Sequence, residues 1–516
     1  MEGHVNSALL STGTIVALIL VPLLTWTILT YTTSPLRAIP GPFFAKWTNL
    51  YRLHATWNNS YPLKIRDLHE KYGPVVQIGP NTITLDFPEL IKTIYGTDGT
   101  YRKTEFYAAS STLVDNKIHY TLFGQPDNTR HGVMKRPIAK YYTVGAALAL
   151  EPQIDRAISE FLTQLDARYA NTKPEEGVCD LWRWSLYLAW DLSSYIIFSR
   201  RFGYLAAAAD FDGTIALSAT INTYFERVGQ MPWSDFWLDK NPFVKIGPAT
   251  FSNLTNVAVD GYTARLTPGK DRDFDPDCPD YLQHFIDAKK LHPDVVDDGA
   301  VIASTMTHII AGADTTAIVV SNIMYYLLSH PPVLEKLVAE VRSAGFDSNK
   351  PISYSAARQL PYLDAVWTEV SRLQPIAGMQ YERYVPSRGL TLPNGTVIPP
   401  GTAVGLNPYI TSRNKSIFGP DADEFRPERW LQRKDETAEA WNARLRVQRS
   451  VVDLNFGAGA RICLGRNLGI VETYKIVATI VNRYDLAFEG LDGGWAVEGA
   501  WVRRPKRLMV RLTVRE

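Results

Sequence analysis

A long run without proline, from about Val295 to Leu328, constrains the fold of this chain more than any other feature. It is mostly apolar, and a helix that is apolar on most of its faces passes through a core rather than along a surface. Much of the remaining sequence is also helical in pattern, for example Pro152 to Tyr169 and Val333 to Ala344. Two β-rich segments flank Gly-Pro-Asn within Val75 to Leu85, which predicts a hairpin. The sequence therefore predicts one large, mainly α domain with a minor β-sheet.

The composition indicates a protein that handles small molecules. Of the 516 residues, 46% are hydrophobic and 21% charged, and the formal net charge is +1, so no strong positive field points to nucleic acid. The three cysteines, Cys179, Cys278 and Cys463, are far apart and form no CxxC pair. That pattern disfavours zinc ribbons, thioredoxin-like chemistry and a disulfide framework.

The N-terminal segment has the pattern of a membrane anchor. From Ala8 to Tyr31 the chain is largely apolar, and no Asp, Glu, Lys or Arg lies between Glu2 and Arg37. A helix over this run is roughly 36 Å long, which is enough to span the hydrocarbon core. A signal peptide or a buried core helix is the alternative, but the start has no Lys or Arg, whereas Arg37 and Lys46 follow the run. This bias predicts an anchor at residues 1–34, a proline-rich neck at 35–45 and a cytosolic domain at 46–516.

The middle of the long core run contains the polar segment AGADTT. Ala311 and Gly312 precede Asp314, Thr315 and Thr316. A glycine in mid-helix costs about 1 kcal/mol relative to alanine, and buried polar side chains are costly unless they are hydrogen-bonded. One interpretation is a kink with local side-chain bonds. The other is a helix opened for a flat ligand, with Asp314 and Thr315 facing a polar groove.

A second polar pair lies in YLDAVWTEVSRLQP. Glu369 and Arg372 are three residues apart and therefore share one helix face. A surface salt bridge is the ordinary interpretation of such a pair, but the neighbouring residues are apolar, which favours a buried pair. A buried ion pair needs further hydrogen-bond partners, and Arg429 of FRPERW is a candidate.

The stretch FGAGARICLG surrounds Cys463. It is not a dinucleotide loop, because GxGxxG requires glycine where Ile462 stands, and it is neither a phosphate-binding loop nor a CxxCH haem attachment. A thiolate ligand remains, because Cys463 precedes a strongly helical run whose free N–H groups lower a thiol pKa. Gly457, Gly459 and Gly465 would let the backbone approach a large planar ligand. Phe456 would cover the sulfur, Arg461 would pair with an anion, and iron in haem fits these features.

This stretch resembles the haem-binding signature FxxGxRxCxG of the cytochrome P-450 superfamily. Phe456, Gly459, Arg461, Cys463 and Gly465 occupy every fixed position. AGADTT resembles the oxygen-activating helix pattern of that family, and the pair in TEVSR, with the arginine of FRPERW, resembles its ExxR triad. The anchor and neck are similar to those of the microsomal class. IPGPFFAKWTNLYRL and YRKTEFY resemble fungal monooxygenases of the pisatin-demethylase-like group.

The resemblance implies a single cytochrome P-450 fold behind one transmembrane helix and specific roles for matching residues. The cofactor is haem b (iron protoporphyrin IX), with Cys463 as the axial thiolate. Asp314 and Thr315 are the expected catalytic residues. The expected cofactor-binding residues are Phe456, Gly457, Arg461, Cys463, Gly465, Arg383, His131, Lys135, Ala311 and Gly312. One departure from the family pattern is Lys135, which replaces the arginine of W/H-xxx-R and is followed closely by Pro137.

The implied reaction is RH + O2 + two electrons + two protons giving ROH and water. No flavin or NADPH domain follows Cys463, so a separate NADPH-dependent reductase is expected, with cytochrome b5 as a possible second donor. The other expected partners are membrane lipid and an apolar small-molecule substrate such as a terpenoid, polyketide or alkaloid, and the expected location is the endoplasmic reticulum membrane. Two alternatives stay open: a haem-thiolate isomerase or dehydratase, which Asp314 and Thr315 disfavour, and a non-catalytic haem or ligand carrier.

Overall fold

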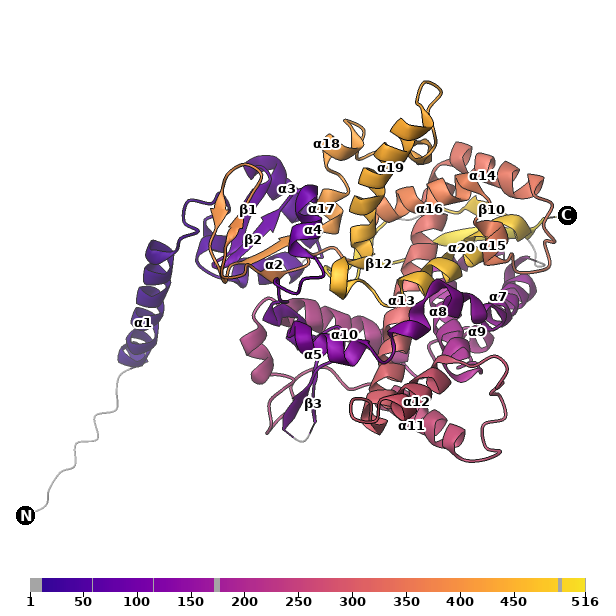
Figure 1. Cartoon of the computed structure of the whole chain (residues 1–516), viewed down its shortest axis with the longest axis horizontal. Helices are drawn as coiled ribbons and strands as arrows, with labels where there is room; N and C mark the ends of the chain where they lie inside the picture. The colour runs from indigo at the N-terminus through magenta and orange to yellow at the C-terminus, as the bar shows by residue number, and fades with distance from the viewer. Residues whose placement is uncertain (1–11, 58, 115, 171–176, 491–493, 516) are drawn as a thin grey trace, which may run out of the picture.

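Helix α13 (Asp298–Ser329) runs through the middle of the protein (Figure 1). The computed structural model describes residues 12–57, 59–114, 116–170, 177–490 and 494–515. Helix α13 packs mainly against α8 (Leu181–Phe198) and α20 (Arg466–Arg483). It starts where the Asp297 side chain accepts a hydrogen bond from the Ala300 N–H, which caps the first turn. The predicted core helix is confirmed, and it continues without a break through AGADTT.

The remaining helices surround this central group. They are α1 (Thr12–Thr33), α2 (Leu50–Trp57), α3 (Tyr61–Tyr72), α4 (Ile91–Ile94), α5 (Asn128–Lys135), α6 (Val144–Ala149), α7 (Glu151–Leu165), α9 (Tyr204–Ala207), α10 (Thr214–Val228), α11 (Ser252–Leu266), α12 (Tyr281–Leu291), α14 (Pro331–Ser343), α15 (Tyr354–Ala357), α16 (Pro361–Leu373), α17 (Pro408–Thr411), α18 (Lys415–Phe418) and α19 (Ala438–Val452). Helices α7 and α14 lie close to the two ranges that the hydrophobic pattern predicts.

The β structure is minor and divided among small sheets. The largest has the order β1-β2-β9-β6, with β1 (Val75–Gly79), β2 (Thr82–Leu85), β9 (Ala403–Leu406) and β6 (Arg383–Tyr384). Strands β1 and β2 form the predicted antiparallel hairpin, and β2 pairs with β9 in parallel. The other sheets are β10 (Tyr484–Phe488), β13 (Met509–Val514) and β5 (Val178–Asp180); β11 (Val497–Glu498) and β12 (Arg504–Pro505); β3 (Thr112–Val114) and β4 (Lys117–His119); and β7 (Leu390–Thr391) and β8 (Val397–Ile398). The mainly α prediction with a minor β-sheet is therefore confirmed.

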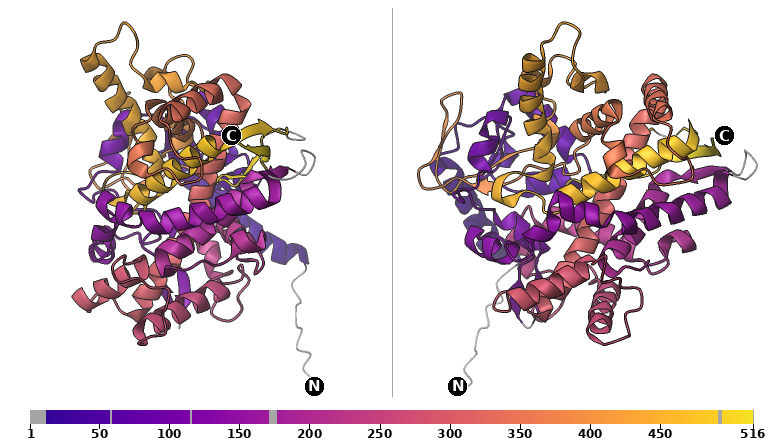
Figure 2. Two further views of the ribbon diagram at one scale, coloured as in Figure 1. Left: turned by 90° about the vertical axis from the view of Figure 1, so that its right-hand side faces the viewer. Right: turned by 45° about the vertical axis from the view of Figure 1, so that its right-hand side comes forward.

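Helix α1 projects from the end of the molecule that carries β1 and β2, on the side away from the C-terminus (Figures 1 and 2). Among the described residues, no single helix meets the length and hydropathy that a membrane crossing requires. The structure therefore does not confirm the predicted transmembrane helix, and residues 8–11 of the apolar run lie outside the described residues. The predicted neck packs on the sheet, because Leu36 and Ile39 are buried and the Gln77 N–H donates to the Pro40 carbonyl at 2.8 Å.

Candidate functional site

The loop around Cys463 connects a short 3-10 helix (Asp453–Phe456) to α20. The Cys463 N–H donates to the Phe456 carbonyl at 2.6 Å, which closes the loop, and the φ of Gly457 is +71°, in the left-handed region that favours glycine. Between residues 456 and 466, Cys463 alone is exposed. The Cys463 side chain is therefore accessible although protein atoms surround it, while the Phe456 ring packs beside the Arg466 guanidinium, 5.6 Å from the ring centre.

The protein surroundings shift the pKa of the Cys463 thiol in opposite directions. Burial among protein atoms raises its pKa, while the backbone N–H groups of Gly465 and Arg466 and the charges of Arg466 and Lys135 lower it. Gly465 is the residue before the first turn of α20, so these N–H groups are free ends of that helix. The same groups stabilise negative charge on sulfur, which a thiol acquires when it binds a metal.

The structure shows one close approach that requires glycine at position 459. Its φ is +59°, and a Cβ at this position would lie under 3.0 Å from the carbonyl oxygens of Tyr95 and Gly96. This close approach is to the backbone that follows α4. At Gly465, a Cβ would meet no described atom within 4 Å.

Four cationic side chains gather beside the loop. Lys135 donates from Nζ to the Ala460 carbonyl at 3.0 Å, Arg461 belongs to the loop itself, and Lys103 and Arg383 are partners in an isolated β-bridge. Within the described ranges, none of the four forms an ion pair with a carboxylate. Such a group of like charges is costly unless an anion joins it.

The pKa values show this excess of positive charge. Burial, followed by the charges of Arg383 and Arg461, holds the pKa of Lys103 well below its ordinary value. Burial and then Arg461 lower the pKa of His131 to about 3, so its imidazole is neutral at pH 7. Burial and then Arg383 lower the pKa of Arg461 to about 10, and its Nη1 atom is buried without a hydrogen-bond partner.

The AGADTT segment presents different residues on different faces of α13. Ala311 is exposed and Thr315 is half-buried, although most of this helix is buried, so one face is open at this point. The Thr315 hydroxyl donates to the Ala311 carbonyl at 2.8 Å, which is a local bond of the kind expected in a kinked helix. Gly312 lies toward α8, because a Cβ there would be 3.5 Å from Ser193 Oγ, an ordinary contact.

Asp314 and Thr316 lie away from that open face. The Asp314 carboxylate is buried, and its Oδ2 atom accepts from Ser218 Oγ at 2.6 Å and from the Arg504 guanidinium. Thr316 is also buried and donates to Glu472 Oε2 of α20 at 2.7 Å. Asp314 and Thr315 thus do not share one groove in this structure, because the carboxylate is held against α10 and β12.

Comparison with known protein families identifies the family of this fold. A family model described as cytochrome P450 matches residues 39–511. The chain belongs to the cytochrome P450 family. It is 40% identical to the cytochrome P450 monooxygenase cfoH of Aspergillus candidus over 98% of this chain and 93% of that protein. It is 33% identical to cicH and 34% identical to pkfB, both cytochrome P450 monooxygenases of Emericella nidulans, over 92% of this chain and 93% and 91% of those proteins.

This cytochrome P450 is therefore an oxidoreductase of the monooxygenase class, and its family binds haem b through a cysteine thiolate. The described residues fit that cofactor. Haem carries two propionates, and the unpaired cations Lys103, Lys135, Arg383 and Arg461 provide the charge that such a dianion needs. The Cys463 thiol lies on the same loop as Arg461, so one segment offers both a thiol and a cation to such a cofactor.

Sequence reasoning missed Lys103 as a member of this group. The segment YRKTEFY places Arg102 and Lys103 side by side, and nothing in that local pattern distinguishes their environments. In the cytochrome P450 structure, Arg102 is exposed and pairs with Glu105, whereas Lys103 is buried and donates to the Phe123 carbonyl at 2.7 Å.

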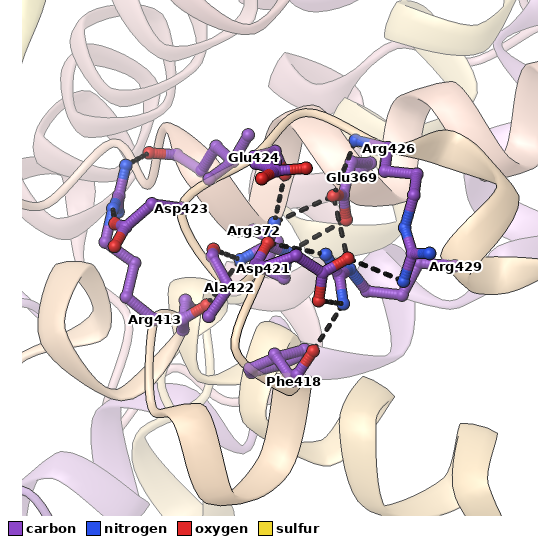
Figure 3. Close-up of polar contacts among 12 residues, drawn as sticks. Glu369, Arg372, Arg413, Phe418, Asp421, Ala422, Asp423, Glu424, Arg426 and Arg429 are labelled. Atoms are coloured by element: carbon purple, nitrogen blue, oxygen red, sulfur yellow. Dashed lines mark hydrogen bonds and ion pairs between the residues drawn. The ribbon is translucent and has the colours of Figure 1, made fainter.

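The ExxR pair of this cytochrome P450 is buried, as the alternative to a surface salt bridge predicts (Figure 3). Both Glu369 oxygens accept from Arg372, at 2.7 and 2.8 Å, and Arg429 Nε lies 3.3 Å from Oε1. The Trp430 indole N–H and the Arg426 backbone N–H also donate to this carboxylate, at 2.8 and 3.0 Å. The two arginines donate in turn to backbone carbonyls of Ser412, Phe418, Asp421, Ala422 and Glu424. This network fixes residues 412–430, which α19 separates from the cysteine loop.

Proposed function

We propose that this cytochrome P450 inserts one oxygen atom from O2 into an apolar small molecule of fungal secondary metabolism, such as a terpenoid, polyketide or alkaloid. The observation that carries the proposal is the combination of an exposed Cys463 thiol with four unpaired cations beside it. Haem, when bound, supplies oxygen activation and electron transfer. A direct test is NADPH-dependent formation of oxidised product by the holoenzyme with a cytochrome P450 reductase, from candidate apolar substrates.

The site residues divide into three proposed roles. Cys463 is the axial ligand, and Phe456, Gly457 and Gly465 shape the loop that presents it. Arg461, Arg383, Lys135 and the neutral His131 hold the propionate side of the cofactor, together with Lys103. Ala311 and Gly312 lie on the helix that faces the reacting centre, and Asp314 and Thr315 handle protons there.

Thr315 is the proposed proton donor at the open face of α13. Its hydroxyl hydrogen is directed to the Ala311 carbonyl, so the lone pairs of Oγ1 remain available to hold a water molecule. Asp314 supplies protons from the interior side of the helix, where it contacts Ser218 and Arg504. The relay therefore needs Asp314 to pass protons from the buried face of α13 to the open face, where Thr315 lies.

Replacing Thr315 with valine is expected to uncouple electron use from product formation. Valine nearly preserves the shape and removes the hydroxyl, so haem content and substrate binding stay intact. A general acid–base contribution is typically about 10²–10⁴-fold, so product per NADPH falls while hydrogen peroxide rises. The measurement is the ratio of peroxide to product at equal NADPH consumption.

Thr316→Val is the matched control for this substitution. Thr316 donates to the buried Glu472, and burial raises the pKa of Glu472 to about 8. Loss of this hydrogen bond costs about 1–3 kcal/mol of stability but leaves coupling unchanged. If Thr316→Val uncouples while Thr315→Val does not, the helix face is assigned wrongly. If neither variant changes coupling, an isomerase or a carrier becomes the better explanation.

Aromatic side chains support an apolar substrate. The rings of Phe106, Phe225 and Trp501 pack against one another with centroid distances of 4.9 to 5.7 Å, and Phe225 belongs to α10. Phe106 also lines a cavity of about 450 Å³, whose wall includes the exposed rings of Trp233 and Phe236 together with charged side chains such as Lys240 and Glu382. We propose this cavity as the route by which an apolar substrate reaches the site.

We also propose an endoplasmic reticulum location, with a single-pass anchor formed by the apolar run 8–31 and a cytosolic catalytic domain. Exposed aromatic side chains support contact with lipid: Phe43 and Phe44 follow α1, and Trp237 and Phe243 lie in the segment after α10. Asn49 and Trp233 line one cavity, so these two segments are neighbours. The proposed electron donor is an NADPH-dependent reductase on the same membrane, with cytochrome b5 as an additional donor.

Deleting residues 1–31 is expected to release much of the protein from membranes without loss of haem. Some association persists through the exposed aromatics, and Trp237→Ser with Phe243→Ser in the truncated protein reduces it further. The measurement is the fraction that sediments with microsomes, with the haem-to-protein ratio measured beside it. A truncated protein that cannot hold haem would show that this segment belongs to the folded core.

A further inference from the structure

The two partners of Asp314 come from separate elements outside α13. Ser218 lies on α10, and Arg504 lies on β12 of the C-terminal hairpin. Both bind the same carboxylate oxygen, Oδ2, and Ser218 Oγ also accepts from Arg504 at 3.1 Å. The Oδ1 atom is buried without a partner. One oxygen of Asp314 thus contacts both α10 and the hairpin.

The hairpin is fastened to α10 at a second point. Glu226 on α10 accepts from the Ala500 and Trp501 N–H groups at 2.6 and 2.8 Å through Oε2. Gly499 has a φ of +90°, and a Cβ there would lie well under 3.0 Å from the Val502 carbonyl, so the turn that carries these N–H groups is tight. A displacement of α10 therefore moves the hairpin, and Arg504 with it.

The same unit carries two rings of the aromatic cluster. Trp501 lies on the hairpin and Phe225 on α10, and their ring centroids are 5.7 Å apart. Phe106 contacts both rings, with Trp501 at 5.3 Å, and Phe106 itself lines the cavity. A ligand in that cavity packs against Phe106 and, through this ring, stabilises the arrangement of α10 and the hairpin in which Arg504 and Ser218 reach Asp314.

Loss of Ser218 and Arg504 as partners would destabilise the buried Asp314 carboxylate. Its side chain is 3% exposed and that of Arg504 is 13% exposed. A buried carboxylate without its cation is strongly unfavourable, so the Asp314 side chain would leave this position if α10 and the hairpin moved away. The position of this carboxylate therefore depends on the positions of α10 and the hairpin.

We propose that Arg504 and Ser218 are positioning residues that hold Asp314 in its working arrangement, and that they couple proton delivery at Thr315 to the closure of α10. The inference rests on the proposed role of Asp314. With this coupling, electrons from NADPH lead efficiently to product only when a substrate holds α10 and the hairpin in place.

The test compares Arg504→Ala, Ser218→Ala and Arg504→Lys in the full-length holoenzyme with reductase. Lys506→Ala is the control, because Lys506 lies on the same hairpin and pairs with the exposed Glu498. The first readout is hydrogen–deuterium exchange of residues 214–228 and 497–505, which requires no turnover. Arg504→Ala is expected to accelerate exchange in both segments by about tenfold, because local opening then costs less.

The second readout is the ratio of hydrogen peroxide to product, with the solvent isotope effect on product formation. Arg504→Ala and Ser218→Ala are expected to raise that ratio by about tenfold or more and to enlarge the isotope effect, while Arg504→Lys restores part of the coupling. The reduced-CO band of each variant shows that it is folded, and Ser218→Ala serves if Arg504→Ala does not accumulate.

The results separate this inference from the proposed function. If Asp314→Asn uncouples the enzyme while Arg504→Ala and Ser218→Ala match the control in exchange and coupling, the positioning role is overturned. If Asp314→Asn itself stays coupled, the role of Asp314 is overturned, and this inference with it. Absence of NADPH-dependent product from the unmodified enzyme counts against the proposed function alone, because the exchange measurement still tests the contact.

Discussion

Cys463→Ala is expected to lack the reduced-CO absorbance band that a thiolate-ligated haem produces. The methyl side chain offers no ligand to iron, and a neighbouring side chain cannot substitute, because the loop of residues 456–466 exposes Cys463 alone. Cys463→His tests the ligand more sharply, since imidazole binds iron but donates less electron density than a thiolate. The expected result is a haem protein whose reduced-CO spectrum lacks the thiolate band and whose monooxygenase activity is abolished.

Cys278→Ser is the control for this experiment. The Cys278 sulfur contacts the Gln153 side chain, with the amide nitrogen at 3.1 Å, and a serine hydroxyl can take the same partner. This variant should keep the full reduced-CO band and ordinary activity. Persistence of that band in Cys463→Ala would assign the axial ligand to another residue.

Glu369→Ala is expected to yield little holoprotein. The substitution removes an acceptor that serves Arg372, Arg429 and Trp430, and it leaves two guanidinium groups buried without their shared carboxylate. Breaking a buried ion pair by removing one partner costs about 3–5 kcal/mol. That is a large part of the 5–15 kcal/mol by which native proteins are typically stable, so the measurement is the yield of haem-loaded protein and its denaturant midpoint.

Two further variants serve as comparisons for Glu369→Ala. Glu369→Gln keeps hydrogen-bond acceptance and loses the charge, so its stability should fall between that of Glu369→Ala and the unmodified protein. Glu70→Ala removes one of the two carboxylate partners of Arg66, in a solvent-accessible pair four residues apart on α3, and should change stability by no more than about 1 kcal/mol. Normal haem content in Glu369→Ala would show that this network is dispensable for the fold.

Local patterns in the sequence predict much of the helical framework. The proline-free apolar run predicts α13 to within a few residues, and the Gly-Pro-Asn turn predicts the pairing of β1 with β2. The apolar neighbours of Glu369 predict its burial. These features are predictable because periodicity, turn residues and neighbouring polarity act over short distances along the chain.

The contacts that complete the site are not predictable in this way. Asp314 meets Ser218 and Arg504, which are far from it in sequence, and no local pattern marks any of the three as partners. Lys103 joins the cations of the site through a bridge to Arg383. Such contacts follow from how distant elements pack, which a single sequence does not reveal.

The close approach of Gly459 to the Tyr95 carbonyl has a consequence for the timing of cofactor capture. Lys135 and Asn128 also contact the loop, through Ala460 and Arg461, so the early part of the chain forms the surface on which the loop is set. Ribosomes add about 5–20 residues per second, so the segment that contains Tyr95 waits for tens of seconds before Gly459 is made. During this interval Lys103 and Lys135 have been made but the thiol of Cys463 has not. The proposed site is therefore completed late in synthesis, and slower completion of the polypeptide would lengthen the time for which these two cations lack the loop that contains Cys463.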